Sequence, residues 1–182
     1  GAEIVERLRD GHFTNLGAAS GIVAGLVGIT PAAGFVSGMA PIAIGALAGV
    51  ASCFAVKAKY RFGYDDSLDV VGVHFVSGFV GSLAVGLFAN PAFFGLDFGE
   101  GLFYGGGFNL LGEQLFANVG VGAYSFVVTL LIALALKRTI GIRVSEEVET
   151  AGIDRHLHNE TAYDFGALVG WITAHTDSRT VA

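Results

Sequence analysis

The stretch LFANVGVGAYSFVVTLLIALAL, residues 115–136, contains no charged side chain. A helix needs about 20 mostly apolar residues to cross the roughly 30 Å hydrocarbon core of a bilayer, so this stretch predicts a transmembrane helix. Three similar apolar stretches precede it, at about residues 16–36, 40–56 and 68–89. The sequence therefore predicts an all-α integral membrane protein with four transmembrane helices.

The composition agrees with a membrane environment. Of the 182 residues, 53% are hydrophobic and only 14% are charged, with a mean hydropathy of +0.64. A soluble domain carries about 25% charged residues. The net charge of −6 argues against a nucleic-acid partner, because such proteins present basic patches to phosphates.

Glycine is abundant, at 28 residues. Five of these glycines follow a four-residue spacing in the first two predicted spans: Gly17, Gly21, Gly25, Gly45 and Gly49. Small residues at this spacing let helix backbones approach closely, so these two spans are suited to close packing against neighbouring helices. The alternative is that small residues are simply common throughout this chain.

The ten lysines and arginines indicate one orientation in the membrane. They lie before the first span, between the second and third, and after the fourth, and residues 90–114 contain none. Basic loops stay in the cytoplasm. We therefore expect a multi-pass plasma-membrane protein with a cytoplasmic loop at 1–15, an outward-facing loop at 90–114 and a cytoplasmic tail at 143–182. Because the chain opens with charged residues and no initiator methionine, we also expect it to be part of a longer protein.

The third span carries an imidazole, His74, about six residues after its predicted start. An ionisable side chain inside a membrane helix is costly and marks a candidate functional site. Helical spacing places Val70, Gly78 and Gly81 on the same face, and this favours a close-packed or pore-lining position. The alternative is a structural histidine that is hydrogen-bonded between helices.

Acidic residues precede this histidine. Asp65, Asp66 and Ser67 are residues that cap helix N-termini, where their oxygens accept hydrogen bonds from free N–H groups. Asp69 lies within the first turn of the apolar run. It either caps the helix or holds a neighbouring loop or helix, and the sequence does not decide between the two.

Three ordered motifs carry a resemblance to a known family. They are Gly17-Ala-Ala-Ser-Gly21 with Ala24-Gly-Leu-Val27 and Ile29-Thr-Pro-Ala-Ala-Gly34; Asp65-Asp66 through Asp69 and Gly72-Val-His74; and Gly141-Ile-Arg-Val144 with Glu146-Glu147, Gly152-Ile-Asp154 and Ala162-Tyr163. Together they resemble the Amt/Mep/Rh ammonium transporters. The resemblance implies that the chain corresponds to the last four helices and the cytoplasmic tail of an eleven-helix fold.

The resemblance also implies a function, the movement of ammonium or ammonia through a hydrophobic pore lined by two histidines. His74 matches the second histidine, and Val70 matches a position in the pore wall. Ser20, Thr30 and Asp69 fall on structural or pore-adjacent positions of the motifs. The first histidine belongs to an N-terminal half that these 182 residues do not contain. Phe75 departs from the family pattern, in which glycine often follows this histidine.

The tail motif implies regulation at the cytoplasmic face. The matching residues are Arg143, Glu146, Glu147, Gly152, Asp154 and Tyr163. In the family this tail docks on the cytoplasmic side, and in many prokaryotic members it meets a PII-type signal protein; the family also implies a homotrimer. An ammonium sensor of the same fold is the alternative function. We expect no cofactor, no metal site and no enzymatic activity, because the predicted spans hold no cluster of Asp, Glu and His.

Overall fold

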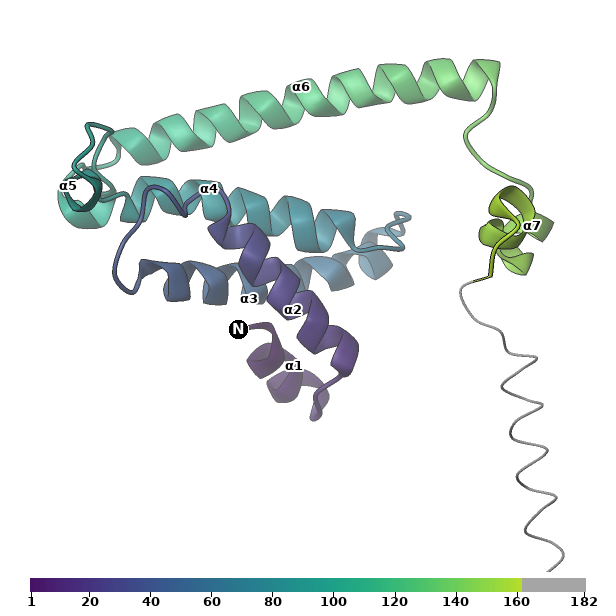
Figure 1. The fold of residues 1–182 in the computed structure, drawn as a ribbon, viewed down its shortest axis with the longest axis horizontal. Coiled ribbons are helices and arrows are strands. Elements are labelled where there is room, and N and C mark those ends of the chain that lie inside the picture. Colours follow the sequence, from purple (N-terminus) through teal and green to yellow (C-terminus); the bar gives the residue numbers. More distant parts are fainter. Residues whose placement is uncertain (162–182) are drawn as a thin grey trace, which may run out of the picture. The chain divides into compact units, whose positions relative to one another are not determined.

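The computed structural model describes residues 1–161. The chain divides into two compact units, one of residues 1–126 and one that begins at Val127, and each is described by itself (Figure 1). The helices that lie wholly within the first unit are α1 (Ala2–Asp10), α2 (Asn15–Ile29), α3 (Ala40–Phe62), the π-helical turn η1 (Val70–Phe75), α4 (Val76–Phe88), α5 (Pro91–Phe94) and the 3₁₀ turn η2 (Leu102–Tyr104). A further helix, α6 (Asn109–Thr139), crosses the boundary between the units.

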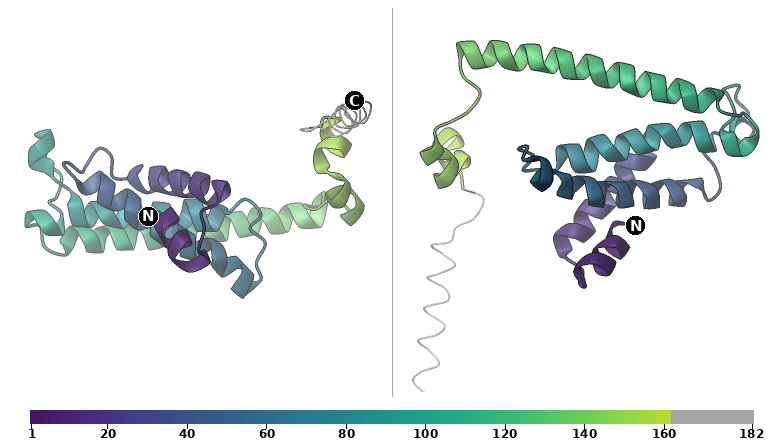
Figure 2. Two further views of the ribbon diagram at one scale, coloured as in Figure 1. Left: turned by 90° about the horizontal axis from the view of Figure 1, so that it is seen from below. Right: turned by 180° about the vertical axis from the view of Figure 1, so that it is seen from behind.

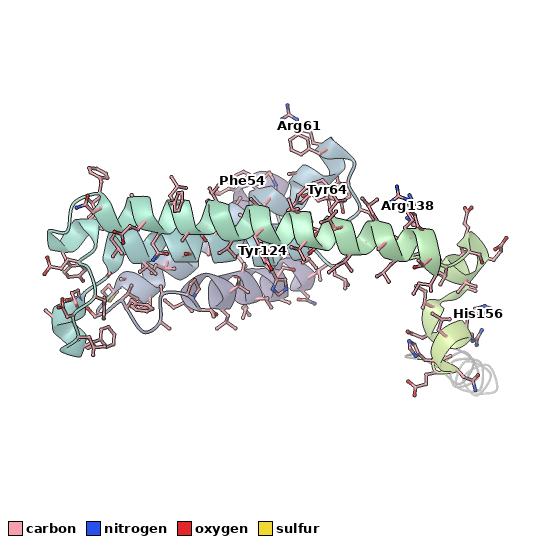
Figure 3. All side chains as sticks on the ribbon, turned by 90° about the horizontal axis from the view of Figure 1, so that it is seen from above. Phe54, Arg61, Tyr64, Tyr124, Arg138 and His156 are labelled. Atoms are coloured by element: carbon pink, nitrogen blue, oxygen red, sulfur yellow. The ribbon has the colours of Figure 1, made fainter. Side chains whose placement is uncertain are left out.

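The prediction of an all-α membrane chain is confirmed. Three helical segments among the described residues are long and apolar enough to cross a membrane: Ala40–Phe62, Val70–Phe88 and Asn109–Thr139. They correspond to the second, third and fourth predicted spans. No residue in the part of α6 that belongs to the first unit, 109–126, is buried; Tyr124 of this part is labelled in Figure 3.

The first predicted span, residues 16–36, is only partly helical. Helix α2 has 15 residues and ends at Ile29. At 1.5 Å per residue it is about 22 Å long, which is short of the hydrocarbon thickness. Pro31 follows directly after the cap residue Thr30, and proline cannot continue a helix. The apolar segment after it folds into successive turns, in which Phe35 N–H donates to Ala32 O at 2.9 Å.

Other boundaries also differ from the sequence-based expectations. Residues 2–10, expected as a loop, form helix α1, because their charged and apolar residues alternate with a helical period. Helix α3 continues to Phe62, where Gly63 terminates it in a left-handed conformation. The predicted outer loop is shorter than expected, since α6 already begins at Asn109.

Helices α2, α3 and α4 pack pairwise (Figures 1 and 2). The glycine spacing serves this packing at Gly25 and Gly45, since a Cβ atom built on Gly25 would lie 3.7 Å from Gly45 O. Helix α4 approaches α2 more closely still. A Cβ atom built on Gly81 would lie 2.7 Å from the carbonyl carbon of Gly28, so only glycine fits there.

The buried apolar cluster of the first unit lies toward the ends of these helices that are opposite to the basic residues. Its members are Ala32, Val36, Ala40, Ile44, Ala84, Val85 and Ala89, with Ile29, Phe88, Phe98 and Leu110 packed against it. Alanine and valine dominate this core, so the helix axes can approach closely without large side chains between them.

The non-helical segments beside this cluster are joined by backbone hydrogen bonds. Val36 forms an isolated antiparallel bridge with Ala89. Asn90 N–H donates to Phe35 O at 2.8 Å, and Gly101 N–H donates to Ala89 O at 2.9 Å. The Asn90 side chain also donates to Ser37 Oγ at 2.8 Å. These bonds satisfy polar groups that an apolar environment would otherwise leave without partners.

The second unit contains the end of α6 and two short helices. Helix α7 spans Glu146–Ala151, and a second π-helical turn, η3, spans Asp154–His158. Ser145 is the N-cap residue of α7, and Gly152 ends the helix with a φ of 101°.

Candidate functional site

The third span begins with a π-helical turn rather than a regular α-helix. In η1, Val70–Phe75, the backbone hydrogen bonds join residues that are five apart rather than four. Val76 N–H, for example, donates to Val71 O. Such turns are rare, occur mostly as single turns within α-helices and are frequent at functional sites. His74 is the fifth residue of this turn, so the candidate pore residue lies on the least regular part of its span.

His74 and Val70 are both exposed in this chain, and Val70 has 53% of its surface accessible. The neighbouring Gly72 and Val73 are buried instead. The turn therefore directs one side inward, against α3, and leaves the histidine on the other side. The sequence allowed two positions for His74, a close-packed one and a pore-lining one. His74 is exposed within the first unit, so the close-packed position is not observed there.

Two acidic residues lie at the start of this turn, and only Asp66 caps it with its side chain. The Asp66 carboxylate accepts hydrogen bonds from Val70 N–H at 2.7 Å and Val71 N–H at 3.0 Å, which is the role of a capping residue. Asp69 makes no side-chain capping bond. Its backbone is left-handed, with a φ of 55°, which is uncommon for a residue other than glycine.

Asp69 instead contacts a neighbouring helix. Lys59 Nζ, near the end of α3, lies 2.5 Å from Asp69 Oδ1, and the two side chains are only 13% and 21% exposed. The same ammonium group donates to Asp66 O at 2.9 Å. Of the two arrangements that the sequence left open for Asp69, this is the one that holds a neighbouring helix. The lysine itself had no sequence signal beyond its basic charge.

Ser20 and Asp69 line the same cavity, which has a volume of about 320 Å³ and also contacts Ser52 and Val56 of α3. Thr30 is not part of it. The Thr30 hydroxyl donates to Leu26 O at 2.7 Å and lies at the other end of α2. The structure thus brings together two of the three residues expected near the pore.

Phe75, the residue that departs from the family pattern, packs on its own helix. Its ring centroid lies 6.2 Å from that of Phe79, and the rings are tilted by 39°. Phe75 remains 59% exposed, so the described residues do not cover the ring that it adds next to His74.

The tail residues fall on α7 and its flanks. Arg143 donates from Nε to Glu149 Oε1 at 2.7 Å and from Nη2 to Glu149 Oε2 at 3.0 Å. This two-point pairing connects the segment before α7 to the helix itself. Glu149 was not among the predicted tail residues. Glu146 and Glu147 occupy the first turn, where negative charge favours the helix dipole. A hydrogen bond from Ser145 lowers the pKa of Glu147.

The remaining tail residues have different surroundings. Gly152 ends α7, and Asp154 opens η3, where its backbone oxygen accepts a hydrogen bond from Glu160 N–H at 3.2 Å. Tyr163 lies outside the described residues.

Residues 1–163 match the model of the Ammonium Transporter Family. The chain belongs to the ammonium transporter family. Among the curated relatives of this chain, an ammonium transporter of Mycobacterium bovis is 50% identical over 171 residues, which cover 92% of this chain and 36% of the relative. An ammonium transporter of Aquifex aeolicus is 47% identical over 160 residues, covering 87% of this chain and 37% of the relative.

Solved structures agree with the assignment. Candida albicans Mep2 matches with a TM-score of 0.74 and 36% identity, over 80% of this chain and 33% of Mep2. Saccharomyces cerevisiae Mep2 matches with a TM-score of 0.73 and 32% identity, over 80% of this chain and 34% of Mep2. The chain therefore spans about a third of the length of the relatives it matches. The family resemblance is confirmed, and the curated relatives above are ammonium transporters by name, not enzymes.

Proposed function

We propose that these 182 residues work as the C-terminal portion of an ammonium transporter, in which His74 lines the pore. The observation that carries the proposal is the position of His74 on a π-helical turn, on the side that residues 1–161 leave uncovered. The partner for that side is the N-terminal half of the same protein. Membership of a family of ammonium transporters supplies the substrate.

The chemistry of the turn suits this substrate. Removing the water shell of ammonium without replacing its contacts is costly, and an apolar environment disfavours the charged form of an amine. A pore wall of residues such as Val70 therefore passes ammonia more readily than a hydrated cation. A neutral imidazole donates from one ring nitrogen and accepts at the other, so His74 and a second histidine can pass a proton between substrate and solvent.

The orientation of the chain in the membrane is part of the same proposal. The distribution of the basic residues supports a plasma-membrane protein with its tail in the cytoplasm and residues 90–114 on the outside. Labelling of an Asp97→Cys variant by an impermeant thiol reagent in intact cells is the check. Labelling that occurs only after the membrane is opened would reverse the orientation.

A homotrimer and a PII-type signal protein are the proposed partners. The exposed length of α6 supports a lipid or protein contact there, and the Arg143–Glu149 pair supports an ordered tail for a cytoplasmic protein to recognise. Truncation after Arg143 should weaken regulation more than membrane insertion. A truncated protein with unchanged flux and an unchanged response to its partner would mark the tail as passive.

The decisive experiment is flux through the reconstituted full-length protein. An ammonium gradient is applied to proteoliposomes, and internal pH reports uptake. His74→Ala should change the ammonium flux or its discrimination against K⁺ while insertion stays normal. His12→Ala, which replaces an exposed histidine between α1 and α2, should change neither. Wild-type flux and selectivity in a correctly inserted His74→Ala protein would return this histidine to a structural role.

The chain alone, residues 1–182, should insert without conducting. Inverted halves form the pore of such transporters, and one imidazole does not replace a pair. Saturable uptake by this segment alone that disappears in His74→Ala would contradict the requirement for a second half. An ammonium sensor remains the second candidate function. It predicts that the full-length protein binds ammonium and signals through its tail without carrying flux.

A further inference from the structure

Lys59 lies near the end of α3 and belongs to none of the three sequence motifs. Its ammonium group binds two points of the segment that leads into the π-helical turn, Asp66 O at 2.9 Å and Asp69 Oδ1 at 2.5 Å. Lys59 thus connects the end of α3 to the start of the histidine-bearing span.

Both aspartates are also bonded, through their other oxygen atoms, to the backbone of the turn. The carboxylate of Asp66 accepts the N–H groups of Val70 and Val71. The carbonyl oxygen of Asp69 accepts Val73 N–H at 2.7 Å. A displacement of the two aspartates is therefore transmitted to the first N–H groups of the turn, whose fifth residue is His74.

The backbone of Asp69 shows why this segment needs an external contact. A left-handed φ of 55° is uncommon for a residue with a side chain, and such conformations persist where surrounding contacts hold them. The ion pair to Lys59 is the side-chain contact that fixes Asp69 in this conformation. Without it, the residue is free to return to the right-handed or extended region, and the turn loses its starting point.

The width of the turn determines where the imidazole points. A π-helical turn contains one residue more than an α-helical turn, and each residue of an α-helix advances by about 100°. Conversion of η1 to a regular α-helix would therefore rotate the residues before the turn by about 100° relative to α4. His74 lies two residues before α4 and would turn by part of this angle, away from the direction that it now has.

We propose that Lys59 is a positioning residue for His74, which acts by holding Asp66 and Asp69 so that the π-helical turn forms. The pair is suited to this role because its side chains are largely shielded from solvent. A shielded pair is screened less by salt than a surface pair, and removal of one partner leaves the other charge uncompensated. This inference rests on the proposed function, in which His74 faces the pore.

The test uses the full-length transporter in proteoliposomes with three substitutions. Lys59→Met removes the ammonium group, Lys59→Arg keeps a positive donor, and Arg61→Met removes a charge two residues later on the same helix. Arg61 is exposed and projects from the end of α3 (Figure 3), so it serves as the matched control.

Lys59→Met should lower the ammonium flux per inserted molecule about tenfold, as expected for a functional group displaced by a fraction of an ångström. Its discrimination against K⁺ should change as well. Lys59→Arg should restore most of the flux, and Arg61→Met should match the wild type. A merely structural role would reduce the amount of inserted protein and its thermal midpoint, but would leave flux per inserted molecule and discrimination unchanged. That result would overturn the inference.

A second measurement does not depend on transport. His74→Cys is placed in a protein whose other cysteines, including Cys53, are replaced by serine, and its reaction with a small water-soluble thiol reagent is timed. Adding Lys59→Met should slow the reaction several-fold, because the side chain at position 74 turns away from its accessible direction, whereas Arg61→Met should not. Equal rates in all three proteins would overturn the inference. A slowed reaction in a protein whose wild type carries no ammonium would refute the proposed function and leave the positioning role standing.

Discussion

The contact between α4 and α2 allows a sharp prediction for Gly81→Ala. The new Cβ atom would lie 2.7 Å from the carbonyl carbon of Gly28 and 3.0 Å from Pro31 Cγ. Real Cβ atoms essentially never approach a neighbour within 3.0 Å. Both obstacles belong to the backbone or to a ring fused to it, so neither can rotate away. The helices have to separate along the length of their contact.

The cost follows from the packing of the surrounding core. Overpacking a close-packed contact typically costs about 1–3 kcal/mol, and the rigid neighbours place Gly81→Ala near the upper value. Alanine is also favoured over glycine in a helix by about 1 kcal/mol. The net effect should be a loss of about 2 kcal/mol in the free energy of unfolding.

Gly78→Ala is the matched control on the same helix. The nearest atom to its Cβ would be Val27 Cγ1 at 3.8 Å, an ordinary contact. This variant should keep the helix-propensity gain of up to about 1 kcal/mol without the clash. The two variants should therefore differ by about 3 kcal/mol, or roughly a hundredfold in the unfolding equilibrium.

The assay is unfolding of the purified full-length protein in mixed micelles by increasing SDS, followed by circular dichroism. Equal stability of the two alanine variants would refute the argument, because the clash is the difference between them. A stabilised Gly81→Ala protein would mean that α2 and α4 are farther apart than this structure places them.

Three further perturbations test other contacts. Asp66→Ala removes the acceptor of two N–H groups and should cost about 1 kcal/mol, measured by the same SDS titration; Ser67→Ala, whose hydroxyl bonds only outside the turn, should not match that loss. Ser82→Ala removes the bond that Ser82 Oγ donates to Gln114 Oε1 at 2.9 Å and a bond that it accepts. It should cost about 1 kcal/mol for the two intramembrane bonds, and an unchanged unfolding midpoint would count against that contact. Glu149→Gln should speed amide exchange in α7, with a smaller effect at high salt because the pair is exposed; an effect that is independent of salt would refute an ionic origin.

The membrane-spanning helices could be predicted because lipid imposes length and polarity on the sequence directly. An uncharged run such as residues 115–136 has few alternatives to a spanning helix. The shortening of the first span could not be predicted from hydropathy, since the turns at 30–36 are as apolar as the helix before them. The backbone restriction that Pro31 imposes, rather than side-chain polarity, determines where α2 ends.

The candidate site also has features that the local sequence predicts and features that depend on tertiary contacts. His74 was found because a titratable side chain in an apolar run is conspicuous, and the capping role of Asp66 follows from its residue type. The π-helical turn has no sequence period of its own to detect. The contact of Asp69 with Lys59 joins residues that are separated by a helix end and a loop, so it depends on how α3 meets η1. Local pattern indicates which residue types matter, and tertiary contact determines the partner of each.

The bridge between Val36 and Ala89 has a consequence for biogenesis. Synthesis proceeds from the N-terminus, so the segment with Phe35 is made well before the residue that satisfies its carbonyl oxygen, Asn90. A short helix followed by non-helical backbone leaves polar backbone groups without partners in lipid. Its release into the bilayer is therefore unfavourable until Asn90 has been made. The first span should therefore remain in the protein-conducting channel, or beside it, until the third span has been made. The two would then enter the bilayer together.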